Sequence, residues 1–322
     1  MKKNDDVYEL ALKVAHLYYY NQLTTEAIAQ ELKMSRPSVS KLLNFARQEG
    51  LVEIKIIDKN ISINPLEKNI LKRFKNLSQV KIVPATNNLD ELEILHRVAQ
   101  FTANEITSYF EKIKTCGLSW HKVLYEVSKY LTPKKLEELN FIATHGLFFS
   151  QKNNSYIQML INFAQNYDCH YSLFPAPFYF EYPSTKNMFL QDSNIANLID
   201  LQNSCEVYIF SISDIEHQLK AHPIIRESFI SEDDLIFLKG MDVVGEISGI
   251  FYKKDGSYQN LPVNSRSSGI KLEVLKQAEH SICVLSNKRS ITALITALDA
   301  GFITDLIIDE VSAKELIKQI KG

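Results

Sequence analysis

The sequence lacks the features of disulfide-rich, metal-binding and membrane-spanning proteins. Its four cysteines lie far apart and form no C-x-x-C pair, which is typical of buried, reduced thiols in a cytosolic protein. His145, His170 and His222 show no metal-ligand spacing and are interpreted as structural or solvated. No apolar run approaches the roughly 18 residues that span a bilayer, and the N-terminus has no apolar signal region. We therefore expect a cytoplasmic protein without a membrane segment, a metal or a cofactor.

The sequence also lacks an excess of either charge. Its 36 basic and 38 acidic residues give a formal net charge of -2, so any polyanion would have to bind a local basic patch. With 45% apolar and 23% charged residues, the chain has no signature of disorder. A length of 322 residues exceeds the about 100–200 residues of one ordinary domain. Two domains are therefore expected.

The stretch from Thr24 to Ile54 predicts two helices with a tight turn between them, preceded by an amphipathic helix over residues 5–20. Thr24 is a favourable N-cap for the first helix of the pair, and Ser35 for the second. Pro37 falls in the first turn of the second helix, where its missing N–H costs nothing. The pattern is typical of a helix-turn-helix.

The end of this stretch predicts a wing. Gly50 stands where a helix C-terminus favours a left-handed residue. From Leu51 to Ile57, apolar and charged residues then alternate, as in a half-buried strand. A strand at this place favours a winged helix-turn-helix.

The second helix of the pair has a basic face. Between Lys33 and Arg47 there are four cations and no acid, whereas residues 1–57 are about balanced. Basic and hydroxyl side chains at the start of such a helix are suited to phosphates and base edges in the major groove. A helical hairpin with an ordinary solvated face is the alternative. We predict a DNA-binding domain over residues 1–58, with the contact residues Thr24, Thr25, Lys33, Ser35, Arg36, Ser38, Ser40, Lys41 and Arg47.

Residues 59–79 form the connection to the second domain. A polar run ends at Pro65, and Leu66, Ile70 and Phe74 then follow a helical spacing. This helix is either a linker that helps the DNA-binding domains to dimerise or the first element of the next domain.

Residues 80–322 alternate between strand-like and helical patterns. Short apolar strands between helices predict an α/β domain with a mainly parallel sheet covered on both faces. Such sheets bind ligands at the carboxyl ends of their strands. The predicted strands are Val80–Pro84, Ile113–Ser119, Phe141–Gly146, Asp168–Phe174, Glu206–Ser211, Val243–Ile247, Ile282–Ser286 and Asp305–Asp309. The predicted helices are Leu89–Phe110, Lys122–Leu131, Ser155–Asn166, Ile270–Ala278 and Ser290–Ala300.

The segment IAQELKMSRPSVSKLLNFARQEGLVEI resembles the DNA-binding domain of the SorC-type bacterial sugar-responsive transcriptional regulators. Four later segments resemble the effector domain of that family, in the same order: CGLSW, FPAPFYF, DVVGEISGIFYKKDG and ALITALDAGFITDLIIDEVSAKELI. The resemblance implies a Rossmann-like α/β effector domain similar to ribose-phosphate isomerases and glucosamine-phosphate deaminases, used for sensing. It also implies a homodimer or homotetramer that binds double-stranded operator DNA and responds to a sugar or sugar phosphate.

The segments that should hold phosphate depart from the family pattern. The family loop usually continues Gly-x-Ser-Trp-Gly-Thr/Ser, whose small residues let backbone amides approach an anion. Here His121 and Lys122 stand in place of the small pair, and Lys122 is a candidate point charge for an anion. Ser290 stands where the family has a lysine, with Lys288 or Arg289 as candidate substitutes. Phosphate recognition and a changed ligand remain equal alternatives.

The resemblance also assigns roles to residues outside those segments. Glu246 matches an acidic position and is suited to accept hydrogen bonds from sugar hydroxyls, Arg266 lies where the family tends to have arginine, and Asp309 is expected to cap the last helix. The expected effector-binding residues are Gly117, Ser119, Trp120, His121, Lys122, Glu246, Arg266, Lys288, Arg289 and Ser290.

Three functions compete. The preferred one is a regulator of carbohydrate genes without enzymatic activity. An isomerase or deaminase fused to a helix-turn-helix would need a positioned acid and base, for which Glu246, His121 and Lys122 are the candidates, although their spacing does not demand it. The third is a regulator whose second domain serves only as an oligomerisation scaffold.

Overall fold

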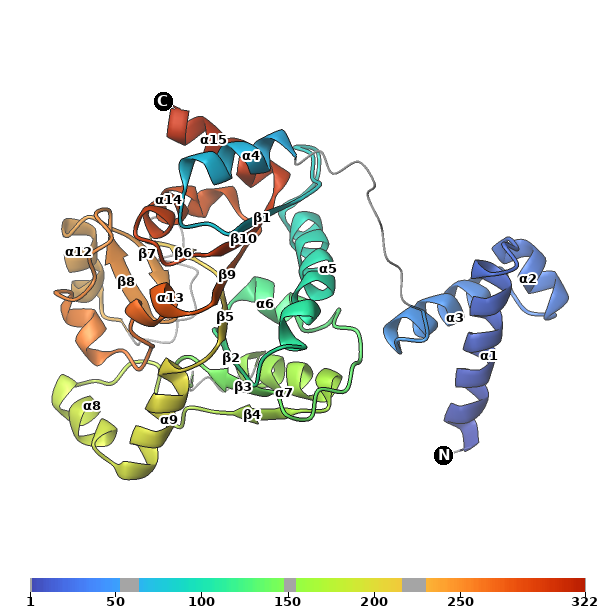
Figure 1. The fold of residues 1–322 in the computed structure, drawn as a ribbon, viewed down its shortest axis with the longest axis horizontal. Coiled ribbons are helices and arrows are strands. Elements are labelled where there is room, and N and C mark those ends of the chain that lie inside the picture. Colours follow the sequence, from blue (N-terminus) through green and yellow to red (C-terminus); the bar gives the residue numbers. More distant parts are fainter. Residues whose placement is uncertain (1, 53–63, 148–154, 216–229, 322) are drawn as a thin grey trace.

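The computed structural model describes residues 2–52, 64–147, 155–215 and 230–321. Figure 1 shows a small unit of N-terminal helices and a larger unit that contains the strands. Leu51 and Val52, the first residues of the predicted wing, are not in a strand. The rest of that prediction, residues 53–57, lies outside the described residues.

The N-terminal unit consists of α1 (Lys2–Tyr19), α2 (Thr25–Glu31) and α3 (Arg36–Gln48). Both predicted N-caps are confirmed: Thr24 accepts a hydrogen bond from the Ala27 amide and Ser35 from the Ser38 amide, each at 3.2 Å. Gly50 follows α3 with a φ of +69°, which is the left-handed conformation expected there. The three helices enclose a core of their own, formed around Val14, Ile28, Val39 and Leu43.

The larger unit is built on a seven-stranded, all-parallel sheet with the order β1-β10-β9-β5-β2-β3-β4. Seven of the eight predicted strands belong to it, to within three residues at each end. Their nearly continuous apolar runs fit strands that are covered on both faces. The strands are β1 (Gln79–Val83), β2 (Thr115–Leu118), β3 (Asn140–Ala143), β4 (His170–Ser172), β5 (Val207–Phe210), β9 (His280–Leu285) and β10 (Asp305–Asp309).

Helices cover both faces of this sheet, as the alternating pattern predicts. One core cluster joins the sheet to α5 (Glu91–Phe110), α6 (Lys122–Val127) and α7 (Ser155–Tyr167). A second cluster joins the opposite face to another group of helices (Figure 1). This second group contains α4 (Pro65–Arg73), α13 (Glu273–Gln277), α14 (Ile291–Asp299) and α15 (Glu310–Lys321).

Helix α4 occupies the region predicted as a linker helix. Its Ile70 and the following Phe74 are buried in the second core cluster, and Glu67 accepts a hydrogen bond from the Ile82 amide of β1 at 3.0 Å. The helix thus packs as an element of the larger unit, which was one of the two alternatives.

The strand predicted at Val243–Ile247 is present as β7, but it does not join the parallel sheet. It pairs antiparallel with β6 (Ser213–Asp214) and β8 (Ile250–Lys253) in a separate three-stranded sheet. Periodicity could not reveal this difference, because a short apolar strand reads alike in either kind of sheet.

The predicted and observed helices differ in two ways. The helix predicted at Ile270–Ala278 is shorter than expected, because α13 has only five residues. Other helices were not predicted at all. The unpredicted helices are α8 (Pro183–Leu190), α9 (Ser193–Asn203), α12 (Glu232–Gly240) and the short 3₁₀ segments η1 (Pro262–Arg266) and η2 (Lys288–Ser290).

Candidate functional site

Buried polar side chains gather where the strands of the parallel sheet end, here called the carboxyl edge. Ser119 follows β2, Thr144 and His145 follow β3, Ser211 follows β5, and Asp309 ends β10; all five are buried. Parallel strands place their carboxyl ends at one edge, which is the usual ligand position in such folds. The predicted location of the site is therefore occupied by polar groups that a core does not need.

The predicted loop Gly117–Lys122 lies at this edge, and its amides are engaged by the protein. Gly117 is inside β2, where a Cβ would lie 2.5 Å from a ring carbon of Tyr208, so no larger residue fits. The Ser119 amide donates to the Ile209 carbonyl, and the Trp120 amide donates to Nε2 of His145, each at 3.1 Å. These two amides are thus bound by a strand carbonyl and a histidine ring.

Trp120 and His145 form a packed aromatic group. The indole Nε1 of Trp120 donates to Oγ of Ser155 at 3.1 Å, and the His145 ring stacks on Tyr156 with 4.6 Å between the centroids. Burial lowers the pKa of His145 to about 3, so this ring is neutral at physiological pH. His145 is thus buried and packed, which agrees with the structural rather than the solvated of the two roles expected for it.

His121 caps α6. Its Nδ1 accepts a hydrogen bond from the Val123 amide at 3.3 Å. Burial, assisted by the neighbouring Lys122 charge, lowers the pKa of His121 to about 4. The ring is therefore a neutral acceptor, and the Lys122 side chain beside it is exposed.

Glu246 lies in β7, opposite Ser213 of β6. Its carboxyl group accepts a hydrogen bond from the Gly249 amide, and burial raises its pKa to about 7. The turn that follows reaches the carboxyl edge, because Oγ1 of Thr144 donates to Oγ of Ser248 at 3.2 Å. The small sheet thereby brings Glu246 toward the ends of the parallel strands.

The predicted arginines are committed to ion pairs. Arg266 in η1 contacts Asp234 of α12 at 2.6 Å, and both side chains are largely buried. Arg289 contacts Glu91 at the start of α5 at 2.7 Å, with both side chains exposed. Arg289 thus forms a surface salt bridge, and Arg266 has a largely buried acidic partner in its own domain.

Lys288 and Ser290 differ sharply in exposure. The Lys288 side chain is exposed, whereas Ser290 is buried and its Oγ has no hydrogen-bond partner among the described residues. The segment η2 that carries both lies against β6 and the start of α15. Of the predicted residues Lys288, Arg289 and Ser290, Ser290 is therefore the buried one.

Two further polar atoms at the carboxyl edge lack a hydrogen-bond partner within the described part of the chain. They are Oγ of Ser211 and Oδ2 of Asp309. The other oxygen of Asp309 accepts from the Ser312 amide at 2.8 Å, which confirms the expected cap of the last helix. Sequence reasoning missed Ser211, although a serine directly after a buried parallel strand was the available signal.

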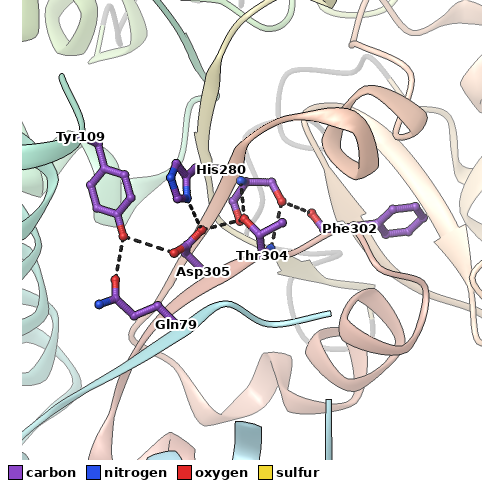
Figure 2. A network of polar contacts seen from close by, with 7 residues as sticks. Gln79, Tyr109, His280, Phe302, Thr304 and Asp305 are labelled. Atoms are coloured by element: carbon purple, nitrogen blue, oxygen red, sulfur yellow. Dashed lines mark hydrogen bonds and ion pairs between the residues drawn. The ribbon is translucent and has the colours of Figure 1, made fainter. Parts of the chain in front are cut away.

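The opposite, amino edge of the sheet carries a closed polar network (Figure 2). Asp305 lies within hydrogen-bond distance of three groups: the Tyr109 hydroxyl at 3.2 Å, Nδ1 of His280 at 2.9 Å and the Thr304 hydroxyl at 2.6 Å. The Tyr109 hydroxyl also contacts Gln79 at 2.7 Å, and burial raises its pKa. Each group is matched within the protein, as a structural network requires.

The residues predicted to contact DNA lie on the N-terminal unit. Arg36, Ser40 and Lys41 are exposed along α3, opposite its buried stripe. The guanidinium of Arg36 contacts the carboxylate of Glu26 from α2 at 2.8 Å. Glu26 therefore neighbours the basic face. The sequence run 33–47, which has no acid, did not predict this partner, because Glu26 comes from the preceding helix.

The remaining predicted contacts surround this face. Lys33 lies in the turn before α3 with a φ of +52° and an exposed side chain, and Arg47 is exposed in the last turn of α3. Thr24 and Ser35 are exposed at the helix starts, while Thr25 and Ser38 are partly buried.

In the described ranges, no group of three His, Cys, Asp or Glu side chains is arranged to hold a metal ion. No helix of the described residues has the length and apolar character needed to cross a membrane.

Comparison with known proteins identifies relatives over nearly the full length. Residues 58–318 match the sugar-binding domain family Sugar-bind. The Deoxyribonucleoside regulator of Bacillus subtilis is 25% identical over 313 residues, which cover 97% of this chain and 98% of the relative.

Two solved structures are similar. A domain of "a possible sugar-binding transcriptional regulator" from Arthrobacter aurescens is 30% identical with a TM-score of 0.71, and the match covers 81% of this chain and 100% of that domain. The full-length sorbitol operon regulator SorC from Klebsiella pneumoniae has a TM-score of 0.70 at 22% identity, with 97% and 99% coverage. The chain therefore belongs to the sugar-binding domain family of SorC-type transcriptional regulators.

Proposed function

We propose that the chain is an effector-controlled transcriptional regulator that binds operator DNA through α2 and α3 as a helix-turn-helix. The exposed basic face of α3 carries this proposal, since it lies opposite a buried stripe that fixes the helix on its neighbours. The regulator names of the relatives support it over an enzyme. A cytoplasmic location follows from this function.

In this proposal the start of α3 enters the major groove. Ser35 and Arg36 are at the first turn, and Lys41 is one and a half turns further on. The pairing of Arg36 with Glu26 suits a reading role, because a fixed guanidinium presents its two donors to a guanine edge in one orientation. Lys33 and Arg47 are placed for phosphates, where point charges suffice.

The second unit is proposed to sense a sugar at the carboxyl edge. Sensing requires that the sugar binds one quaternary arrangement better than another, since a ligand shifts an equilibrium only by its differential affinity. A homodimer or homotetramer satisfies this requirement and matches the two-fold symmetry expected of an operator. Glu246, Ser290 and the loop Gly117–Lys122 are the proposed effector contacts.

The DNA-reading role is tested by Arg36→Ala in the full-length protein. The operator is obtained by selection from random duplexes, and affinity is measured by fluorescence anisotropy. We expect a loss of about 1–3 kcal/mol on the selected duplex and a smaller loss on random DNA. The control Arg97→Ala removes another exposed arginine, from α5, and should leave both affinities unchanged. Equal binding by wild type and Arg36→Ala on both duplexes would contradict the proposal.

A further inference from the structure

The carboxyl edge contains three buried polar atoms without a hydrogen-bond partner. Within the described residues they are Oγ of Ser211, Oγ of Ser290 and Oδ2 of Asp309. Buried hydroxyl and carboxyl groups are nearly always matched, so three unmatched ones at one edge of the sheet call for a partner there. The two other unmatched side-chain atoms of the described residues belong to Thr102 in α5 and to Tyr258 after β8, neither at the end of a parallel strand. Ser211, Ser290 and Asp309 are each at most 5% exposed.

These three residues lie at or after the ends of adjacent strands. β10, β9 and β5 are consecutive in the sheet, with Asp309 ending β10, η2 following β9 and Ser211 following β5. In β5, Val207 and Ile209 face the helices α5 and α6, as Ile307 does in β10. Because side chains alternate along a strand, Ser211 and Asp309 continue on that same face. α6 contacts β9, the strand between them.

At the position where the family pattern holds phosphate, three backbone amides are already hydrogen-bonded to protein acceptors. The amides of Ser119, Trp120 and Val123 donate to a carbonyl and to two histidine rings. An anion cradle needs such amides to point at the ligand. His121 has moreover no charge to offer, because its pKa is lowered to about 4.

The second phosphate position is likewise self-contained. Asn287 accepts the Arg289 amide through Oδ1 at 2.8 Å, and the Arg289 guanidinium is paired with Glu91. The lysine of the family pattern is replaced by Ser290, which carries no charge. Of the two cations in η2, Arg289 is paired with an acid, and only the exposed Lys288 has no acidic partner among the described residues. A phosphate here would therefore meet a single exposed lysine.

The buried ionisable groups at this edge are acids, and burial raises the pKa of Glu246 and of Asp309, so none of them offers phosphate a positive charge. Asp214, Glu246 and Asp309 are buried carboxyl groups, with Asp214 in β6 beside η2 and Glu246 paired opposite β6. A phosphate dianion would find no cation among them and would be repelled wherever one is ionised, whereas sugar hydroxyls can hydrogen-bond to carboxyl groups in either protonation state and to serines.

We propose that the effector is an uncharged sugar or sugar alcohol, whose hydroxyl groups are bound by Ser211, Ser290 and Asp309. This inference rests on the proposed sensing role and names its ligand class. Of the two alternatives that the sequence left open, phosphate recognition and a changed ligand, the second is the one proposed.

The first experiment is a thermal-shift measurement on the full-length protein. The probes are free pentoses, hexoses and four- to six-carbon sugar alcohols, each beside its phosphate ester, with inorganic phosphate as a further control. At least one free compound should raise the melting temperature with rising concentration, and its ester should not. A larger shift with an ester, or no shift with any free compound, overturns the proposal. Operator binding, measured separately, then still reports on the proposed function.

Variants test two of the three contact residues, Ser211 and Asp309, against a control serine outside the site. Ser211→Ala and Asp309→Asn should each weaken binding of the active compound by about tenfold in calorimetry, because one hydrogen bond to the ligand is lost. Asparagine retains the oxygen that accepts the Ser312 amide, so α15 keeps its cap. The control Ser128→Ala removes a buried hydroxyl at the far end of α6 and should leave affinity unchanged. Unchanged affinity in both site variants contradicts the assignment.

A third variant tests why phosphate is excluded. His121→Gly frees the Val123 amide at the start of α6, and glycine is a well-tolerated N-cap residue. The phosphate ester of the active compound should then bind at least about tenfold better than it binds the wild type, while Lys122 is retained. No gain in ester binding would show that the histidine cap is not what excludes it.

Discussion

The two edges of the parallel sheet contain similar residues in opposite states. At the amino edge, the buried Asp305 is surrounded by groups within hydrogen-bond distance, and the buried Ser281 donates to the Phe302 carbonyl and accepts the Thr304 amide. At the carboxyl edge, Asp309 and Ser211 are buried just as deeply, yet each retains an unmatched atom. Burial alone therefore does not separate a structural polar group from a binding one. Here the two edges differ in whether the buried polar atoms find partners within the protein.

The largest expected effect is on the amino edge. Asp305→Ala leaves the Tyr109 hydroxyl, the Thr304 hydroxyl and His280 without their common acceptor. The loss of several matched buried bonds should reduce the free energy of unfolding by about 3 kcal/mol in urea titrations. The exposed Asp299, which pairs with Arg73, is the control, and its alanine variant should lose less than about 1 kcal/mol. Equal losses of stability in the two variants would show that the Asp305 network stabilises the fold no more than a surface ion pair does.

A pH dependence comes from Glu246. Its folded pKa of about 7 exceeds the ordinary value of 4.5, so between these values the folded state binds more protons than the unfolded state. Stability from this group is therefore full below about pH 4.5 and is lost as pH rises to 7, by about 3 kcal/mol at 1.36 kcal/mol per pH unit. Urea titrations at pH 5 and pH 8 should show this loss in the wild type relative to Glu246→Gln. Parallel profiles in the two proteins would refute the raised pKa.

The smallest effects come from a matched pair of buried serines. Ser281→Ala removes a hydroxyl with two partners and should cost about 1–3 kcal/mol, because the Phe302 carbonyl loses its donor. Ser211→Ala removes a hydroxyl without a partner and should change stability by less than about 0.5 kcal/mol. Thermal unfolding of the ligand-free proteins measures both. A large cost at Ser211 would mean that its hydroxyl serves the fold and not a ligand.

Local signals in the sequence predicted the elements well. The caps at Thr24 and Ser35 and the left-handed Gly50 each depend on a few neighbouring residues, and all three are confirmed. The apolar strands of the parallel sheet were found because a strand covered on both faces needs no partner to be recognised.

Long-range pairing could not be read in the same way. The antiparallel partners of β7 come from β6 and β8, and nothing in the five residues of β7 distinguishes them from a parallel strand. The ion pairs of Arg36 with Glu26 and of Arg289 with Glu91 likewise join residues from separate elements. For the same reason, Ser211 could be placed at an edge by its position but could not be known to lack a partner.

The pairing of β1 with β10 has a consequence for synthesis of the protein. These strands come from opposite ends of the α/β unit, and β1 is an outermost strand whose neighbour in the sheet is β10. A nascent chain therefore holds β1 and α4 without their final partners until residues 305–309 have left the ribosome. The N-terminal helices, whose core is their own, are complete much earlier. A chain that stops before β10 would thus carry a finished N-terminal helical unit beside an unfinished sheet. Under the proposed function, such a product could still bind DNA but could not respond to an effector.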